Sequence, residues 1–445
     1  MPAVAATNAL LEADAPIHSW YRFVLSFPPH LVRQYLDRFE IEPGQTVLDP
    51  FCGSGTTLVE CRKAGVKSVG VEAHPMAALA SRVKTNWHLD PRALTRRARR
   101  ILRRASQWES LHGLSQPEVA DDQAARRRRT TPEAEPRLSD EERRLLPEGF
   151  LSPRPLKRLL LLREAIREET RRAAEEASEF FLLALAHVIV NGAGNFAFGP
   201  EIYRTRPQRD HNVLRHFARQ TASMIADLAD VRQTHPSPAP CRVIPGDARE
   251  LHGVEGPFGG VITSPPYPNE KDYTRTTRVE SVLLGLVPTR ERLRQTKETL
   301  LRSNTRNVFV GDADAEWVRG FKRVERLCAE IETRRLALGK TSGFERLYPK
   351  VVAHYFGGMR RHFRALRPRL APGARCAYVV GDQLSFLMVH IPTAELLAEL
   401  AEAEGFHVLG TDFWRQRLGT KVRNGRLGER SVRVKEEILL LANRD

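Results

Sequence analysis

The chain has 445 residues, and its 70 Lys and Arg against 54 Asp and Glu give a formal net charge of +16. This length can hold one large α/β domain with a helical region, and the positive charge favours a polyanionic partner, because basic side chains release condensed counterions from nucleic acid. The five cysteines form no close pair and no even set, which excludes a disulfide framework or a cysteine zinc site and predicts reduced thiols.

The first informative segment is a strand, a glycine turn and a helix. The apolar run 45–48 predicts a strand, and Pro50 prevents a helix directly after it. Gly53 and Gly55 have no Cβ, so a ligand can touch the backbone there, and a helix over 57–64 follows. The order predicts the first βα unit of a doubly wound sheet, in which ligands bind beyond the carboxyl ends of the strands.

A second strand, over 68–71, ends on an acidic residue. Glu72 stands at the spacing expected for a carboxylate that accepts hydrogen bonds from two ribose hydroxyls. An ordinary βα turn with a surface glutamate is the alternative, which the strand, the turn and the acid together disfavour. No Gly-Lys-Ser or Gly-Lys-Thr follows the glycines, which excludes a phosphate-binding P-loop. The pattern therefore indicates a small nucleotide-like cofactor.

The segment 91–238 predicts a mostly helical insertion. A helix over 91–110 should be basic along much of its surface, and residues 113–147 are polar and proline-containing, as in a mobile basic linker. A long helix over 156–191 follows, whose apolar run 180–190 is too short to span a membrane. The candidates for DNA contact on the first helix are Arg96, Arg100 and Arg103.

Two features of this insertion have competing interpretations. His187, in the apolar run, is expected to be a hydrogen-bonded core residue instead of a ligand. The segment 191–211 is predicted to be a loop whose Arg204 and Arg206 contact nucleic acid, although a plain connection between helices explains it equally well.

Two further strands bring polar groups to the same edge of the sheet. The strand 242–245 ends in Gly246-Asp247, and the strand 260–263 runs into Ser264-Pro265-Pro266-Tyr267. The prolines remove two N–H donors, so this loop presents carbonyl oxygens and a hydroxyl beside an aromatic ring. Such acceptors can bind an amine carried by a planar ring. A rigid Pro-Pro turn with a half-buried tyrosine is the alternative, disfavoured because the tetrapeptide follows a strand and shares its edge with the glycine turn.

The end of the chain completes the sheet. An inserted segment over about 269–350 follows the tetrapeptide, and residues 366–382 predict a helix and then a fifth strand. The runs 406–415 and 432–441 predict a closing antiparallel pair around Asn424-Gly425.

The motifs DPFCGSGTT at 49–57 and TSPPY at 263–267 resemble those of the S-adenosylmethionine-dependent DNA amino-methyltransferases. Serine before the Pro-Pro pair resembles their cytosine-N4 branch. The likeness extends to SFPPHLVRQYL, VGVEAHP and GDAREL, and covers roughly half the chain. It implies an α/β class I methyltransferase fold, a doubly wound sheet of seven strands with an antiparallel last hairpin. The catalytic domain would comprise 1–90 and 239–445.

The resemblance also assigns roles to single residues. Ser264, the Pro265 carbonyl, Pro266 and Tyr267 would hold the target base, with Ser264 positioning the amine and Tyr267 stacking on the ring. Glu72 would bind the ribose, Asp247 would lie near the adenine amino group, and the residues of the remaining cofactor contacts would be Phe27, Asp49, Phe51, Gly53, Gly55 and Thr56.

The resulting hypothesis is methyl transfer from S-adenosylmethionine to the N4 amine of cytosine in double-stranded DNA. The base would be flipped out of the duplex at a cost of a few kcal/mol. The partners would be DNA and a cognate restriction endonuclease, without a metal or a membrane, in a bacterial cytoplasm at the nucleoid. An adenine-N6 DNA enzyme, an RNA (tRNA) base amino-methyltransferase and a non-catalytic DNA-binding specificity subunit are the alternatives.

A cytosine-C5 mechanism is rejected. Pro240-Cys241 resembles the nucleophile motif of those enzymes, but Cys241 begins the predicted strand at 242–245, whereas catalysis needs a residue at a carboxyl end.

Overall fold

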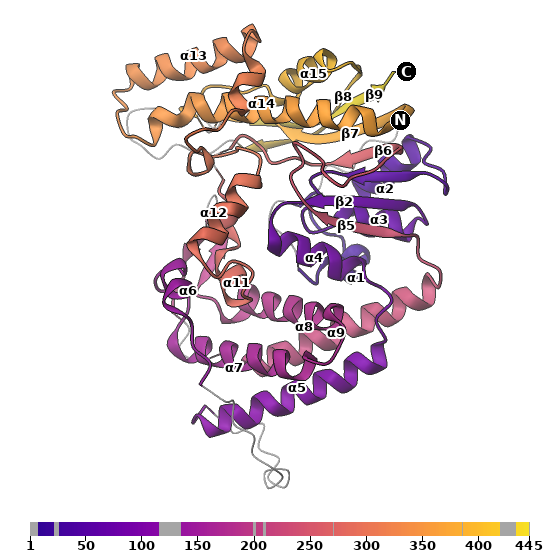
Figure 1. Ribbon diagram of the computed structural model, residues 1–445, viewed down its shortest axis with the longest axis vertical. Helices are drawn as coiled ribbons and strands as arrows, with labels where there is room; N and C mark the ends of the chain where they lie inside the picture. Colours follow the sequence, from indigo (N-terminus) through magenta and orange to yellow (C-terminus); the bar gives the residue numbers. More distant parts are fainter. Residues whose placement is uncertain are drawn as a thin grey trace.

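The computed structural model describes residues 8–21, 26–114, 135–198, 202–207, 211–269, 271–384, 386–418 and 433–444. Its centre is a seven-stranded sheet in the order β5-β2-β1-β6-β7-β9-β8 (Figure 1). The first five strands in this order are parallel, and β9 is antiparallel to both of its neighbours. The doubly wound sheet with an antiparallel last hairpin is therefore confirmed. The strands are β5 (Cys241–Pro245), β2 (Lys67–Glu72), β1 (Thr46–Asp49), β6 (Phe258–Thr263), β7 (Leu370–Gly381), β9 (Arg433–Asn443) and β8 (Phe406–Leu418).

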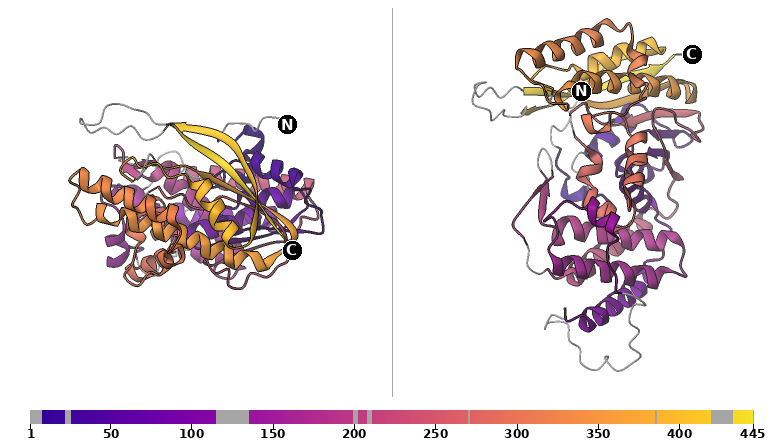
Figure 2. Two further views of the ribbon diagram at one scale, coloured as in Figure 1. Left: turned by 90° about the horizontal axis from the view of Figure 1, so that it is seen from above. Right: turned by 60° about the vertical axis from the view of Figure 1, so that its left-hand side comes forward.

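Alternation along the strands builds a core on each face of the sheet. Val47 points to the face that α2 (Pro29–Arg38) and α3 (Thr56–Lys63) cover. Leu48 points to the opposite face, which α14 (Tyr348–Leu366) and α15 (Thr393–Ala403) cover. This period of two follows from strand geometry. The long β8–β9 pair forms one edge of the sheet, as the left view of Figure 2 shows.

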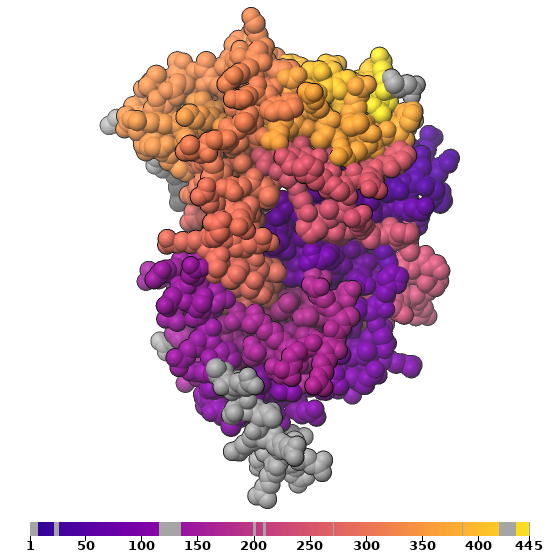
Figure 3. All heavy atoms as spheres, in the orientation of Figure 1, coloured from indigo at the N-terminus to yellow at the C-terminus, as the bar shows by residue number. Residues whose placement is uncertain are grey.

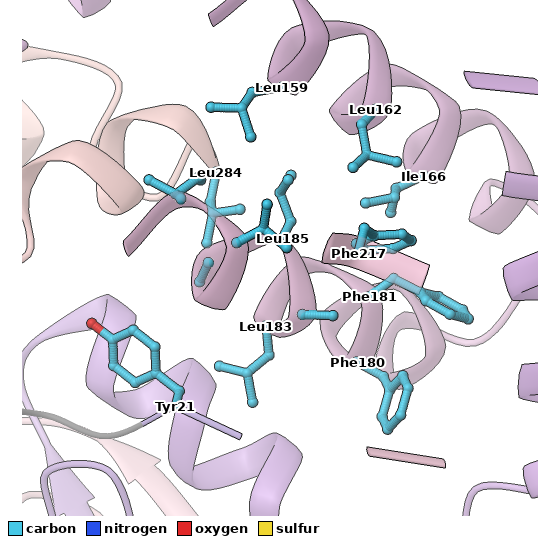
Figure 4. Packing of buried hydrophobic residues seen from close by; sticks show 14 of the residues in the cluster. Tyr21, Leu159, Leu162, Ile166, Phe180, Phe181, Leu183, Leu185, Phe217 and Leu284 are labelled. Atoms are coloured by element: carbon cyan, nitrogen blue, oxygen red, sulfur yellow. The ribbon is translucent and has the colours of Figure 1, made fainter. Parts of the chain in front are cut away.

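A helical unit lies beside the sheet, below it in Figure 1. Its helix α8 (Glu175–Val188) packs on α4 (Pro75–Thr85), and one hydrophobic core runs through both parts. In Figure 4 the aromatic rings of Phe181 and Phe217 meet within this core, which also contains Tyr21 and Leu284 from outside the insertion. The helices of this unit are α5 (Pro91–Leu111), α7 (Pro153–Thr170), α8 (Glu175–Val188) and α9 (Val213–Thr234).

Three segments of this unit differ from the sequence prediction. Part of the expected linker is helix α6 (Asp140–Leu145), because Ser139 and Glu142 form a capping box, while residues 115–134 lie outside the described part. The expected loop at 191–211 contains a short hairpin of β3 (Phe196–Phe198) and β4 (Ile202–Arg204). The expected single helix over 156–191 is broken between α7 and α8.

Helix α8 and the π-turn after it are longer than the apolar run suggests. Together Glu175–Ala193 form a helix of 19 residues, and an 18-residue stretch of it has a mean hydropathy of 1.2. By length and composition alone this helix could cross a membrane. It packs against α4, α7 and α9, and 56% of that stretch is buried. It is therefore the central helix of the helical unit.

The segment after the tetrapeptide connects the two parts of the molecule. It contains α10 (Tyr273–Thr276), α11 (Arg278–Leu283), α12 (Arg290–Thr299) and α13 (Lys322–Ala337). Helix α11 packs into the core of the helical unit, and α13 packs on α14. In Figure 3 the segment descends along one side of the molecule from the sheet to the helical unit.

Candidate active site

A cavity of about 340 Å³ lies at the carboxyl ends of the parallel strands. It is continuous from the glycine turn after β1 to the tetrapeptide after β6, so the two sequence motifs share one space. Ten of the residues predicted for cofactor and base line it: Phe27, Phe51, Gly53, Thr56, Glu72, Asp247, Ser264, Pro265, Pro266 and Tyr267. Asp49 and Gly55 do not.

Asp49 is fully buried behind the glycine turn. Its Oδ1 accepts a hydrogen bond from Thr263 Oγ1 at 2.6 Å and one from the backbone N–H of Phe51 at 3.2 Å. Burial raises the pKa of this carboxyl to about 6, although the Thr263 bond acts against the shift. Asp49 therefore joins the ends of β1 and β6, and its contact with the cofactor stays a prediction.

Gly55 serves the backbone of the turn. It is the N-cap of α3 with φ +87°, a conformation that residues with a Cβ rarely adopt. A Cβ there would lie 3.0–3.3 Å from Ser81 on α4, so it would collide with a helix and not with the contents of the cavity. Gly53, at φ +52°, does line the cavity, and nothing of the protein lies closer than 4.0 Å to the position its Cβ would take.

Glu72 ends β2 at the cavity wall. One carboxylate oxygen accepts from the N–H of Gly53 at 2.8 Å, and the other accepts from the N–H of His74 at 2.7 Å. Burial raises the pKa of Glu72 to about 7, while these backbone hydrogen bonds oppose the shift. Each oxygen keeps a further lone pair, so the carboxylate can still accept from a ligand.

His74 connects this wall to the segment after the tetrapeptide. Burial lowers its pKa to about 4, so the ring is neutral near pH 7. Its Nδ1 accepts from the N–H of Met76, and its Nε2 therefore donates to Thr277 Oγ1 at 3.0 Å. Thr277 in turn donates to the carbonyl of Tyr273, whose side chain lines the cavity.

Asp247 follows β5 and is held by a buried arginine. Arg249 Nε donates to both oxygens of Asp247, at 2.9 and 3.0 Å, while its NH1 reaches Asp314 Oδ2 at 2.5 Å. Asp314 is fully buried, and the charge of Arg249, helped by Arg361, lowers its pKa despite the opposing effect of burial. A Cβ at Gly357 would lie 1.8 Å from the carbonyl of Asp314, so this glycine lets the inserted segment press on α14.

The tetrapeptide occupies the other part of the cavity. Ser264 Oγ donates to the carbonyl of Val379 on β7 at 3.1 Å, which leaves its lone pairs as acceptors. The guanidinium carbon of Arg417 lies 5.5 Å from the centroid of the Tyr267 ring. Arg417 Nε pairs with Glu436 at 2.9 Å, and Arg415 also pairs with Glu436.

Several residues that line the cavity were not predicted from the sequence. Among them are Asn8, Tyr21, Lys271, Tyr273, Trp414, Arg415, Arg417 and Glu436. Lys271 had a signal, since it stands four residues after Tyr267. Arg417 and Glu436 had none, because only the pairing of β8 with β9 and β7 brings them to Tyr267.

The residues predicted to bind DNA lie outside the cavity. Arg96 and Arg103 are exposed on α5, whose other face buries apolar side chains. Arg100 is exposed too but pairs with Glu169 on α7 at 3.1 Å, a partner the sequence did not indicate. Arg204 and Arg206 are exposed at the β3–β4 hairpin. Their contact with DNA stays a prediction.

Two other predictions concern the chemistry of buried groups. His187 Nδ1 lies 3.2 Å from the carbonyl of Trp20, which confirms a hydrogen-bonded position. All five cysteines are free thiols, and Cys241 begins β5, at the end of the strand remote from the cavity. No group of three or more His, Cys, Asp or Glu residues suited to a metal ion occurs in the described ranges.

Comparisons with known proteins bear on the class of this site. Residues 14–81 match the N6_N4_Mtase family model, described as DNA methylase. The chain is 23% identical to the type II methyltransferase M.BsoBI of Geobacillus stearothermophilus, over 94% of this chain and 84% of that protein. It is 38% identical over 73 residues to the type II methyltransferase M.MjaII of Methanocaldococcus jannaschii, a match that covers 16% of this chain and 14% of the relative.

A solved structure is also similar. The crystal structure of TrmN from Thermus thermophilus aligns with a TM-score of 0.27 and 12% identity, over 93% of this chain and 48% of that one. The strand order, and not this alignment, defines the fold of the present chain as that of the class I methyltransferases. The strand order, the family match and the similarity to M.BsoBI together support a DNA methyltransferase of the N4 or N6 amino type.

Proposed function

We propose that the protein transfers a methyl group from S-adenosylmethionine to the N4 amine of cytosine at a specific site in duplex DNA. The observation that carries the proposal is the shared cavity. The Glu72 carboxylate lines it beside the glycine turn, and the Ser264 hydroxyl lines it in the tetrapeptide. A nucleoside-binding acid and an acceptor-rich loop in one space fit a reaction between a nucleoside cofactor and an amine.

The cofactor residues fit S-adenosylmethionine by their chemistry. Glu72 offers acceptors for the two ribose hydroxyls, and Gly53 leaves room for the ligand beside the turn. Asp247, fixed by Arg249, presents a carboxylate that can accept from the adenine amine. Phe27 and Phe51 supply apolar walls, and the cofactor, when bound, supplies an activated methyl group.

The base residues act by positioning. An aromatic amine is a poor nucleophile because its lone pair is delocalised into the ring. Ser264 and the Pro265 carbonyl would accept its two N–H groups, which turns the lone pair toward the methyl group, while Tyr267 stacks on the ring. Ser264 does not serve as a base, since a hydroxyl stays neutral near pH 7. The proton leaves to water.

The substrate proposal includes a flipped base in double-stranded DNA, because the amine is inaccessible within the stack. The name of the M.BsoBI relative supports a place in a type II restriction-modification system, with a cognate endonuclease as a partner in a bacterial cytoplasm. Serine at the first position of the tetrapeptide favours cytosine N4 over adenine N6.

The test is incubation with labelled S-adenosylmethionine and separate pools of unmethylated phage DNA and of RNA, followed by nucleoside mass spectrometry and mapping of the methylated positions. We expect N4-methylcytosine in DNA. N6-methyladenine as the sole product would overturn the cytosine assignment, 5-methylcytosine would overturn the mechanism, and label in RNA alone would overturn the substrate.

A further inference from the structure

Basic side chains gather in the part of the cavity that the tetrapeptide Ser264–Tyr267 forms. Lys271, Arg415 and Arg417 all line it. Arg417 lies against the Tyr267 ring, and Arg415 covers the ring of Trp414 with its guanidinium carbon 4.5 Å from the centroid. A Cβ on Gly381 would lie within 3.0–3.1 Å of Arg417, Glu436 and Tyr267 at once, so these side chains converge on one point of β7.

One carboxylate serves this cluster. Glu436 is 4% exposed and binds both arginines. Lys271 is half-buried, and no acidic side chain of the described chain lies within ion-pair distance of it. Burial lowers the pKa of Lys271, the charge of Arg417 acts in the same direction, and the charge of Glu436 opposes the shift. Among the described residues, three cations thus face one carboxylate, so their side chains together carry an excess of positive charge.

Excess positive charge in a partly buried site is stabilised by an anion. A neutral base stacked on Tyr267 cannot supply the negative charge. The DNA backbone can, because phosphates flank the flipped nucleotide and are covalently linked to it. Guanidinium groups match phosphate oxygens in geometry, and an ammonium adds a point charge. Glu436 holds the two arginines in place before the nucleotide arrives.

We infer that Lys271, Arg415 and Arg417 form a binding site for a phosphate that flanks the flipped nucleotide. The inference rests on the proposed function, since it needs a base on Tyr267. It assigns the anchoring of the flipped nucleotide to the catalytic cavity itself, apart from any contact that α5 or the β3–β4 hairpin makes with the duplex.

The experiment measures duplex affinity against salt concentration, with a short duplex that carries the mapped methylation site and S-adenosylhomocysteine present. The variants are Lys271→Gln, Lys271→Arg and Arg417→Gln. Lys322→Gln, with the same loss of charge on the exposed start of α13, is the matched control. We expect Lys271→Gln and Arg417→Gln each to reduce the slope of log K against log salt by about 0.9. Lys271→Arg should keep the slope.

Each other result overturns the inference. An unchanged slope with reduced turnover in Lys271→Gln would place Lys271 on the base, and weaker binding of S-adenosylhomocysteine would place it on the cofactor carboxylate. An equal slope change in Lys322→Gln would show a diffuse field instead of a site. A wild-type protein that methylates no DNA would instead refute the proposed function, a result that the mapping step reveals first.

Discussion

The cavity has two sides that are built in different ways. We call the side with the glycine turn, Glu72 and Asp247 the cofactor side, and the side with the tetrapeptide the base side, after their proposed ligands. On the cofactor side, Glu72 bonds to the turn only 19 residues earlier, and β1 and β2 are neighbours in chain and sheet. On the base side, Tyr267 meets Arg417 from a strand 150 residues later. Contacts between neighbouring segments, such as Glu72 with the glycine turn, leave a motif in the sequence, whereas the contacts that distant strands add to the tetrapeptide, such as Arg417 on Tyr267, leave only scattered residues.

The largest expected effect tests whether the cofactor side is truly local. Asp314 is a distant element of that side, because Arg249 links it to Asp247. Removal of one partner from a buried ion pair costs about 3–5 kcal/mol. We therefore expect Asp314→Ala to lower the free energy of unfolding by that amount and to weaken S-adenosylhomocysteine binding, as measured by urea unfolding and calorimetric titration.

The control is Glu316→Ala, which removes an exposed carboxylate two residues away that pairs with Arg319 on the surface. A wild-type unfolding curve for Asp314→Ala would show that the cofactor side needs no support from the inserted segment.

The next effect separates the two sides by function. Ser264→Ala removes one acceptor for the amine and should reduce kcat on the order of 10²–10³ fold. The affinity of the Ser264→Ala variant for S-adenosylhomocysteine should not change, because the Ser264 side chain contacts β7 and not the glycine turn or Glu72. Single-turnover methylation and calorimetry measure the two quantities. A matched loss of cofactor affinity would mean that the two sides are coupled.

The third effect is a pH dependence confined to the cofactor side. Burial raises the pKa of Glu72 to about 7, and donors on a bound ribose favour the ionised carboxylate. Affinity for S-adenosylhomocysteine should therefore rise as pH increases from about 6 to about 8, with release of a proton. Because the folded pKa lies above the ordinary value of 4.5, the ligand-free protein should lose stability as pH rises from about 4.5 to about 7, with no further loss from this group at higher pH.

Glu72→Gln, which cannot ionise, should bind more weakly and flatten the pH profile. Calorimetric titration at several pH values in buffers of different ionisation enthalpy measures both affinity and proton release. A profile in Glu72→Gln that matches the wild type would assign the titration to another group.

The smallest effect concerns surface charge outside both sides. Replacement of Arg96, Arg100 and Arg103 by Gln should weaken DNA binding for all sequences and lower the salt slope by up to about 0.9 for each lost contact. Arg100 should contribute least, because it already pairs with Glu169, a carboxylate that it shares with Arg104. Filter binding at several salt concentrations provides the measurement, and an unaltered slope would remove α5 from the DNA interface.

The sequence predicted the parallel strands and the two motifs because each is a local pattern that ends in a turn. It did not predict the β3–β4 hairpin, since strands of three residues carry almost no periodicity. Helix α6 was missed because the prolines and charges around it are typical of a linker, although Ser139 and Glu142 form a capping box. The positions of Arg417 and Glu436 depend on strand pairing, which spacing along the chain does not encode.

The single core that joins the helical unit to α4 limits how this protein can be re-engineered. A recognition module that could be exchanged between enzymes would close its own apolar surface, but here Leu79 and Val83 of α4 are buried together with Phe180 and Leu183 of α8. Excision of 91–238 would expose the buried apolar side of α4 to water. A chimaera with a new sequence preference would therefore have to carry α4 and its partners across as one piece.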